Sequence, residues 1–94
     1  MSRVSSNIIE IDGVGFQYTG VMYVNAILGI ASANSPAVAM LDKNNINVFP
    51  LEDAVTGQRF YPISFAHPQR IENLKVDVFT NMKKILVYVD RFAS

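Results

Sequence analysis

The sequence predicts an all-β protein, either an antiparallel β-sandwich or a small jelly-roll-like barrel of about seven short strands. Three observations support this prediction. Runs of alternating apolar and polar residues recur along the chain, turn-forming residues separate these runs, and no segment has a strong helical period. The 94 residues correspond to one domain. We therefore expect a single β-sandwich domain over residues 1–94, with residues 1–6 as a flexible N-terminus.

A long uncharged segment between Asp12 and Asp42 allows three interpretations: a membrane span, a buried helix or strands. A span needs about 20 mainly apolar residues, whereas this segment contains asparagines, serines and a proline that breaks a helix. Residues 21–31 alternate and have one wholly apolar face, which favours a strand over the helix that the pattern leaves open. A turn at residues 34–36 then separates this strand from a second one at residues 37–41.

Weaker signals place the other elements of the first half. Residues 7–11 alternate weakly and are expected to form a first edge strand. The polar residues 42–45, with two adjacent asparagines, separate residues 37–41 from an apolar run at 46–51, which predicts a hairpin. Residues 52–57 are polar and end in glycine, so we expect a loop or a single helical turn there.

The second half of the chain contains the clearest strand pattern. Residues 59–65 are β-like, and Pro62 places them at a sheet edge or a bulge because proline has no N–H to donate. Residues 66–73 are expected to form a loop. Residues 74–90 hold two alternating runs around a turn at 80–83, which predicts an antiparallel hairpin with one buried face.

The order of these pieces, GVGFQYTGVMYVNAILGIAS, AVAMLDKNN, RFYPISF and LKVDVFTNMKKILVYVD, covers residues 13–90. It resembles small β-sandwich accessory proteins of tailed bacteriophages. The resemblance implies a structural role on a virion, as a capsid decoration, cement or head-fibre component. It also implies a homo-oligomer that is assembled in the host cytoplasm, and no functional residue is carried over from it. Without it we expect a cytoplasmic protein, since the N-terminus lacks the apolar core of a signal peptide.

The composition also predicts self-association. Half of the residues are hydrophobic and only 17% are charged, against a usual charged share of about a quarter. A small domain has much surface to cover, so we expect a second copy of the chain to cover apolar surface, with a trimer favoured. The alternative is that one sandwich buries both faces of its strands. If Met22 and Val87 point inward, four apolar side chains point outward. These candidate interface residues are Tyr23, Ile27, Leu86 and Tyr88.

An alternative function is a small binding module for a glycan or another small ligand. It would use the expected loops at 52–58 and 66–73, which offer polar and aromatic side chains. The candidate residues of this loop surface are Arg59, Tyr61, His67 and Arg70.

Catalytic chemistry has little support in the sequence. His67 is the only histidine and there is no cysteine, so neither a nucleophile with its base nor a transition-metal site is indicated. The GVG at 13–15 lacks the rest of any phosphate-binding motif. Eight basic residues balance eight acidic ones, which argues against nucleic-acid binding, including a stacking platform at Phe60 and Tyr61. The sequence still allows a glycosidase, since its two catalytic carboxylates can come from distant positions of the chain. Such an enzyme needs a substrate cleft, however, which so small a domain seldom holds. We therefore expect a non-enzymatic protein with no cofactor, no metal and no membrane partner.

Overall fold

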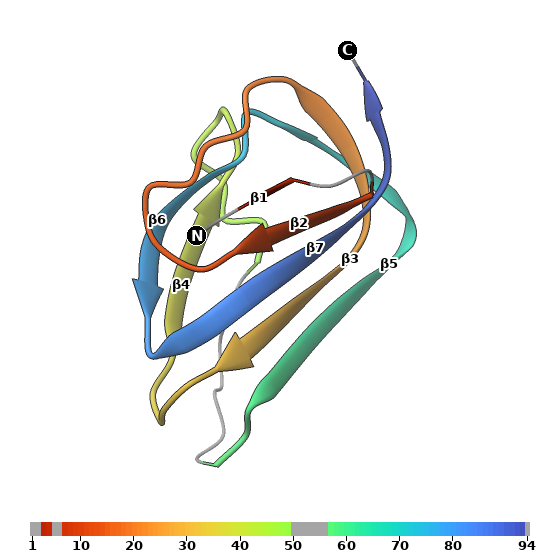
Figure 1. The fold of residues 1–94 in the computed structure, drawn as a ribbon. Helices are drawn as coiled ribbons and strands as arrows, with labels where there is room; N and C mark the ends of the chain where they lie inside the picture. The colour runs from red at the N-terminus through yellow and green to blue at the C-terminus, as the bar shows by residue number, and fades with distance from the viewer. Residues whose placement is uncertain (1–2, 5–6, 50–56, 94) are drawn as a thin grey trace.

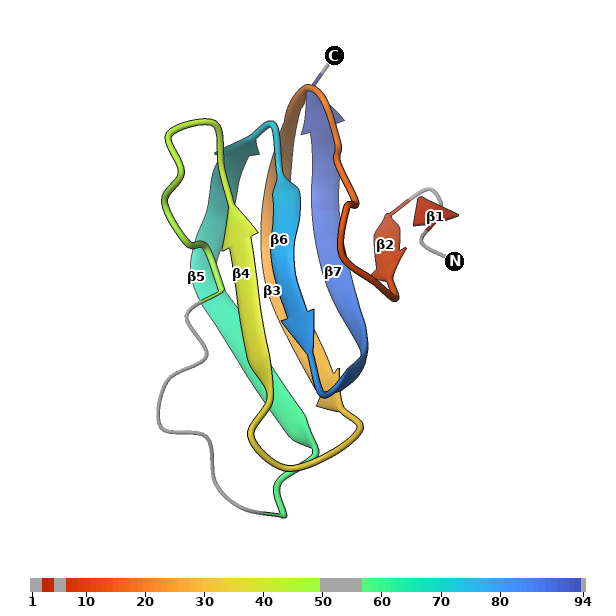
Figure 2. The same ribbon diagram turned by 90° about the vertical axis from the view of Figure 1, so that its left-hand side faces the viewer.

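The structure, a computed structural model, describes residues 3–4, 7–49 and 57–93. It consists of two antiparallel β-sheets facing each other, and Figure 2 looks onto the smaller sheet with strands of the larger one behind it. The strands are β1 (Arg3–Val4), β2 (Ile8–Ile11), β3 (Val21–Ala31), β4 (Ala37–Leu41), β5 (Phe60–Glu72), β6 (Lys75–Thr80) and β7 (Met82–Ala93). The larger sheet has the order β1-β2-β7-β3-β5, and β4 pairs with β6 in the smaller one (Figure 1).

The predicted all-β, sandwich-like architecture is confirmed. Six strands have four residues or more, and β1, with two residues, completes the larger sheet. β1 lies within the N-terminal segment that we expected to be flexible, and its two residues pair with Glu10 and Ile9 of β2. β3 has the bounds expected for it, residues 21–31, whereas β5 and β7, with 13 and 12 residues, are longer than expected.

From β3 to β7, successive strands alternate between the two sheets. The expected hairpin over residues 74–90 is therefore wrong, because β6 and β7 belong to different sheets. Only Asn81, with a left-handed φ of 56°, separates these two strands. A hairpin needs a loop of at least about two residues, so this single residue directs the chain across to the other sheet. Its Nδ2 atom also donates to the carbonyl oxygens of Asn34 (2.9 Å) and Ser35 (3.2 Å). These bonds link the connection from β6 to β7 with the connection from β3 to β4, which also crosses between the sheets.

The strand β5 is the edge of the larger sheet, as Pro62 predicted. The expected loop over residues 66–73 is wrong, since β5 continues to Glu72. A wide bulge interrupts it. Ser64 pairs with Ala26 and Gln69 with Val24, so four residues of β5 lie opposite a single residue of β3.

The core lies between the sheets, and its buried side chains in the described part of the chain are all apolar. β3 contributes Met22 and Val24 and then changes face at Asn25, where its register with both neighbouring strands shifts. After this bulge the inward positions are Ile27, Gly29 and Ala31. The expectation that Ile27 points outward with Tyr23 is therefore wrong, since Ile27 is only 1% exposed.

Gly29 makes room for an aromatic ring inside the sandwich. Phe49, which follows the turn after β4, is fully buried. A Cβ atom at position 29 would lie 2.9 Å from its Cζ and 3.0 Å from the Cε of Met82. A glycine within a strand often marks such a close approach.

Candidate functional site

The face of the larger sheet that points away from β4 and β6, called the outer face below, carries a continuous apolar group. Its centre is Leu28, which lies between Leu86 of β7 and Pro62 of β5. In the next row, Tyr88 lies between Ile8 of β2 and Ala26 of β3. The larger apolar members of the outer face are Ile8, Leu28, Ile30, Phe60, Leu86 and Tyr88.

Two of these six side chains are exposed. Phe60 is 60% exposed and Ile8 is 39% exposed, while the side chains between them are half-buried by their neighbours. The outward side of the smaller sheet is different: apart from Val78 and the half-buried Leu41, it presents small and polar residues such as Ala37 and Thr80. The exposed apolar surface of the two sheets is therefore concentrated on the outer face of the larger one.

Polar groups of the outer face border its apolar centre. At one end, Lys84 lies beside Ile30, and its Nζ is 3.4 Å from Oε2 of Glu10, which lies beside Leu86. At the other end, the guanidinium of Arg91 stacks over the ring of Tyr23 at 4.2 Å. Arg70 of β5 is the register partner of Tyr23 on the other side of β3. An apolar centre with a polar rim is the usual anatomy of a protein–protein interface.

The structure brings three of the four candidate interface residues together. Tyr23, Leu86 and Tyr88 lie on the outer face, whereas Ile27 packs in the core. The bulge in β3 explains the error, because it moves every later residue of that strand to the opposite face. The same bulge turns Leu28 and Ile30 outward, and strict alternation had placed both with Met22. The polar Asn25 within an apolar strand was the available signal of this irregularity.

The four candidate residues of the loop surface do not form one site. Tyr61 points inward, is 8% exposed and donates its hydroxyl to the Gln58 carbonyl oxygen at 3.2 Å. Arg59 is exposed and His67 lies in the bulge of β5. Arg70 is six register positions from Tyr61 along β3, or about 20 Å. Residues 52–56 of the other expected loop lie outside the described residues.

A cavity of about 280 Å³ lies beside Arg70, between the turn after β4 and the bulged part of β5. Its lining residues are Asp42, Ile46, Asn47, Val48, Phe65, Gln69 and Arg70. Of these, only Arg70 was among the candidates from the sequence, because the bulge that brings Phe65 and Gln69 to the turn is a tertiary feature. Among the described residues, no group of three or more His, Cys, Asp or Glu side chains could hold a metal ion.

The fold and the outer face define a class: an antiparallel β-sandwich with one exposed apolar sheet face. Comparisons with protein-family models, with curated proteins and with solved structures find no match for this chain. The resemblance to phage accessory proteins therefore stays a prediction. The described residues include no helix with the length and apolarity required to cross a membrane.

Proposed function

We propose that this chain is a non-enzymatic structural protein that self-associates through its outer face. We also propose that it attaches to a larger assembly such as a phage virion, in a decoration or cement role. The observation that carries the proposal is the continuous apolar group centred on Leu28, which no other described part of the chain covers.

The size of the outer face suits a second copy of the chain. Three strands over the eight residues from Tyr23 to Ile30, together with the four residues of β2, give a flat area of about 440 Å² at about 4.8 Å strand spacing and about 3.3 Å per residue. This is roughly 8% of the total surface of 5422 Å², close to the share of about a tenth that a stable interface takes from a small protein. The side chains standing on the sheet raise the accessible area towards the roughly 800 Å² per partner of such interfaces.

A self-complementary face also agrees with the composition. Only 17% of the residues are charged, and the charged side chains of the outer face border its apolar centre: Glu10 beside Leu86, Lys84 beside Ile30, and Arg70 and Arg91 beside Tyr23. Two copies packed on the apolar centre would place these charges at the edge of the contact, where solvent limits the cost of desolvating them.

Light scattering across a dilution series tests the proposal. The protein should have a multiple of its monomer mass of 10.4 kDa, three times for the expected trimer. Leu86→Asp and Tyr88→Asp each place a charge in the apolar centre and should lower the mass to that of the monomer. Both side chains are half-buried on the outer face, so far-UV circular dichroism should keep its β-type spectrum.

Val78→Asp is the matched control, because Val78 is 41% exposed on a strand of the smaller sheet. This variant should keep the mass of the parent protein. A parent that is monomeric at high concentration would refute self-association. An oligomer that survives both outer-face substitutions would show that its interface lies elsewhere.

A further inference from the structure

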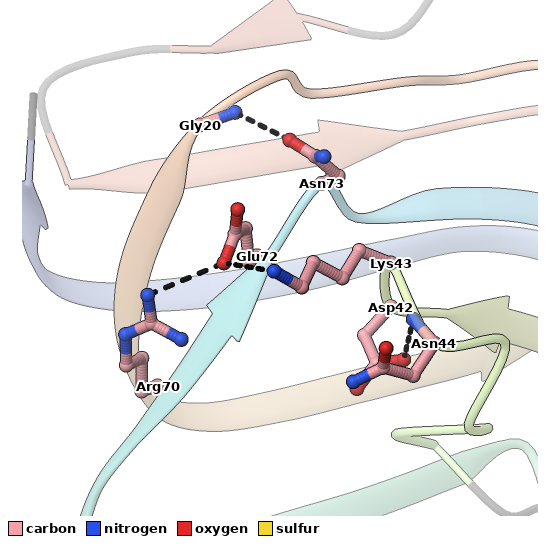
Figure 3. Close-up of polar contacts among 7 residues, drawn as sticks. All are labelled: Gly20, Asp42, Lys43, Asn44, Arg70, Glu72 and Asn73. Carbon is pink, nitrogen blue, oxygen red and sulfur yellow. Dashed lines mark hydrogen bonds and ion pairs between the residues drawn. The ribbon is translucent and has the colours of Figure 1, made fainter.

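The cavity between the turn after β4 and β5 has the features of a ligand site, and it is separate from the apolar centre of the outer face. Its volume of about 280 Å³ is close to the lower limit of the roughly 300–1,000 Å³ found for small-molecule pockets. Such a volume suits one small ring. Its charged lining residues are Asp42 and Arg70. Figure 3 shows these two side chains, with the ion pairs that Glu72 makes to Arg70 and Lys43.

One wall of the cavity is a turn whose shape is fixed by its own side chains. Asp42 Oδ1 accepts hydrogen bonds from the backbone N–H groups of Asn44 (2.8 Å) and Ile46 (3.0 Å). Asn47 Oδ1 accepts from the N–H of Phe49 at 3.0 Å. Asn45 has a left-handed φ of 61°, which asparagine tolerates well. These contacts pre-organise the wall, so a ligand would not need to order it on binding.

The other wall is the bulged part of β5, which brings Phe65 and Gln69 to the cavity. Bulges often lie next to functional sites because they redirect side chains. Phe65, with Val48 and Ile46, supplies apolar surface. The Gln69 side chain is exposed and has no hydrogen-bond partner among the described residues, so its amide can both donate and accept.

The four charged groups around the cavity, those of Asp42, Lys43, Arg70 and Glu72, sum to zero formal charge. Glu72 Oε1 lies 3.2 Å from Arg70 Nη2 and 3.4 Å from Lys43 Nζ. The Asp42 carboxylate accepts two backbone N–H groups, so part of its hydrogen-bonding capacity is already used. The two cations and the two carboxylates cancel in formal charge, which favours a neutral ligand over an ionic one.

We propose that this cavity binds a single neutral sugar ring. A sugar ring has apolar C–H faces for Phe65 and Val48, and hydroxyl groups that both donate and accept hydrogen bonds for the Gln69 amide and the Arg70 guanidinium. This inference does not depend on self-association, since the apolar centre of the outer face and the cavity use different residues.

Amide NMR titrations with four methyl glycosides, those of glucose, galactose, mannose and N-acetylglucosamine, test the proposal. At least one should cause saturable shifts of the Gln69 side-chain amide and of backbone amides over residues 42–48. We expect a Kd of roughly 1–10 mM, as suits so small a site. Gln69→Ala should weaken binding about fivefold, the usual effect of one hydrogen bond.

A second variant and a control keep the test independent of folding. Ile46→Arg places a long side chain at the mouth of the cavity and should abolish binding, and Ile46 is 60% exposed, so the fold should tolerate it. His67→Ala changes an exposed residue of the same bulge that does not line the cavity, and binding should be unchanged.

Three results would overturn the sugar assignment. The first is the absence of shifts with all four glycosides at about ten times the expected Kd. The second is a set of shifts elsewhere, with no effect of Gln69→Ala or Ile46→Arg. The third is a stronger response to inorganic phosphate than to any glycoside, which would make the cavity an anion site. Light scattering on the same samples reports on self-association separately.

Discussion

Replacing Gly29 by alanine should destabilise the protein, although alanine is normally the better residue within a strand. The added Cβ would lie 2.9 Å from Phe49 Cζ, 3.1 Å from Phe49 Cε2 and 3.0 Å from Met82 Cε. The Met82 methyl group ends a flexible side chain and can move. The Phe49 ring is rigid and fully buried between the sheets, so in a close-packed core it can move only if its neighbours move too.

The magnitude follows from two opposing effects. Overpacking a core typically costs about 1–3 kcal/mol. Alanine also reduces the backbone freedom of the unfolded chain, which stabilises the folded state by about 0.4–1 kcal/mol. This gain applies at Gly29 because its backbone lies outside the left-handed region. The net loss in the free energy of unfolding should be about 1–2 kcal/mol. For a domain of this size each kcal/mol lowers Tm by roughly 4–8 °C.

Urea unfolding followed by circular dichroism measures this loss as a lower midpoint at an unchanged slope. Phe49→Leu removes both ring atoms that the new Cβ would approach, so Gly29→Ala should cost about 1 kcal/mol less in that background. Gly13→Ala is the control, because a Cβ there meets nothing within 4 Å. A Gly29→Ala protein as stable as its parent, or additive effects in the double variant, would refute the packing argument.

Three further substitutions test other parts of the fold by the same unfolding assay. Asn73→Ala should lower the free energy of unfolding by about 1–2 kcal/mol, since Asn73 has a φ of 55° and its Oδ1 accepts a hydrogen bond from the N–H of Gly20 at 2.9 Å. Asn73→Gly should lower it less, because glycine adopts this φ without strain. Equal losses in the two variants would contradict the backbone contribution. Phe49→Ala should cost about 3–5 kcal/mol by opening a cavity in the core, and a loss below about 1 kcal/mol would show that the ring is not well packed. Lys84→Ala removes the ion pair with Glu10 and should lower the free energy of unfolding by less than about 1 kcal/mol. If the variant is still less stable than the parent by the same amount in about 1 M salt, the loss does not come from the ion pair.

The fold class could be predicted because it depends on local patterns. Alternation, turn residues and the missing helical period are all visible within windows of about ten residues. Pro62 even located the sheet edge, since its missing N–H excludes a central strand. The assignment of strands to sheets could not be predicted in this way. A turn between two alternating runs looks the same whether the chain pairs with itself or crosses to the other sheet, and only partners far along the chain decide between them.

The candidate interface could be predicted only up to the first irregularity of its strand. Tyr23 lies before the bulge at Asn25 and was placed on the correct face, while Ile27 lies after it and was not. A shift of one residue exchanges the two faces of a strand, so one unrecognised bulge reverses every later assignment. The cavity was missed for a related reason, because the bulge in β5 that forms one wall occurs where the sequence predicted a loop.

The position of β7 within the larger sheet has a consequence for how the chain folds. β7 (Met82–Ala93) is the last described strand, yet it pairs with both β2 and β3. During synthesis, β2 and β3 therefore have no common partner strand until β7 has been made. Contacts between segments so distant along the chain slow folding, typically to milliseconds or seconds. The unjoined strands expose apolar surface and open edges in that interval, so folding should compete with aggregation most strongly before β7 has docked.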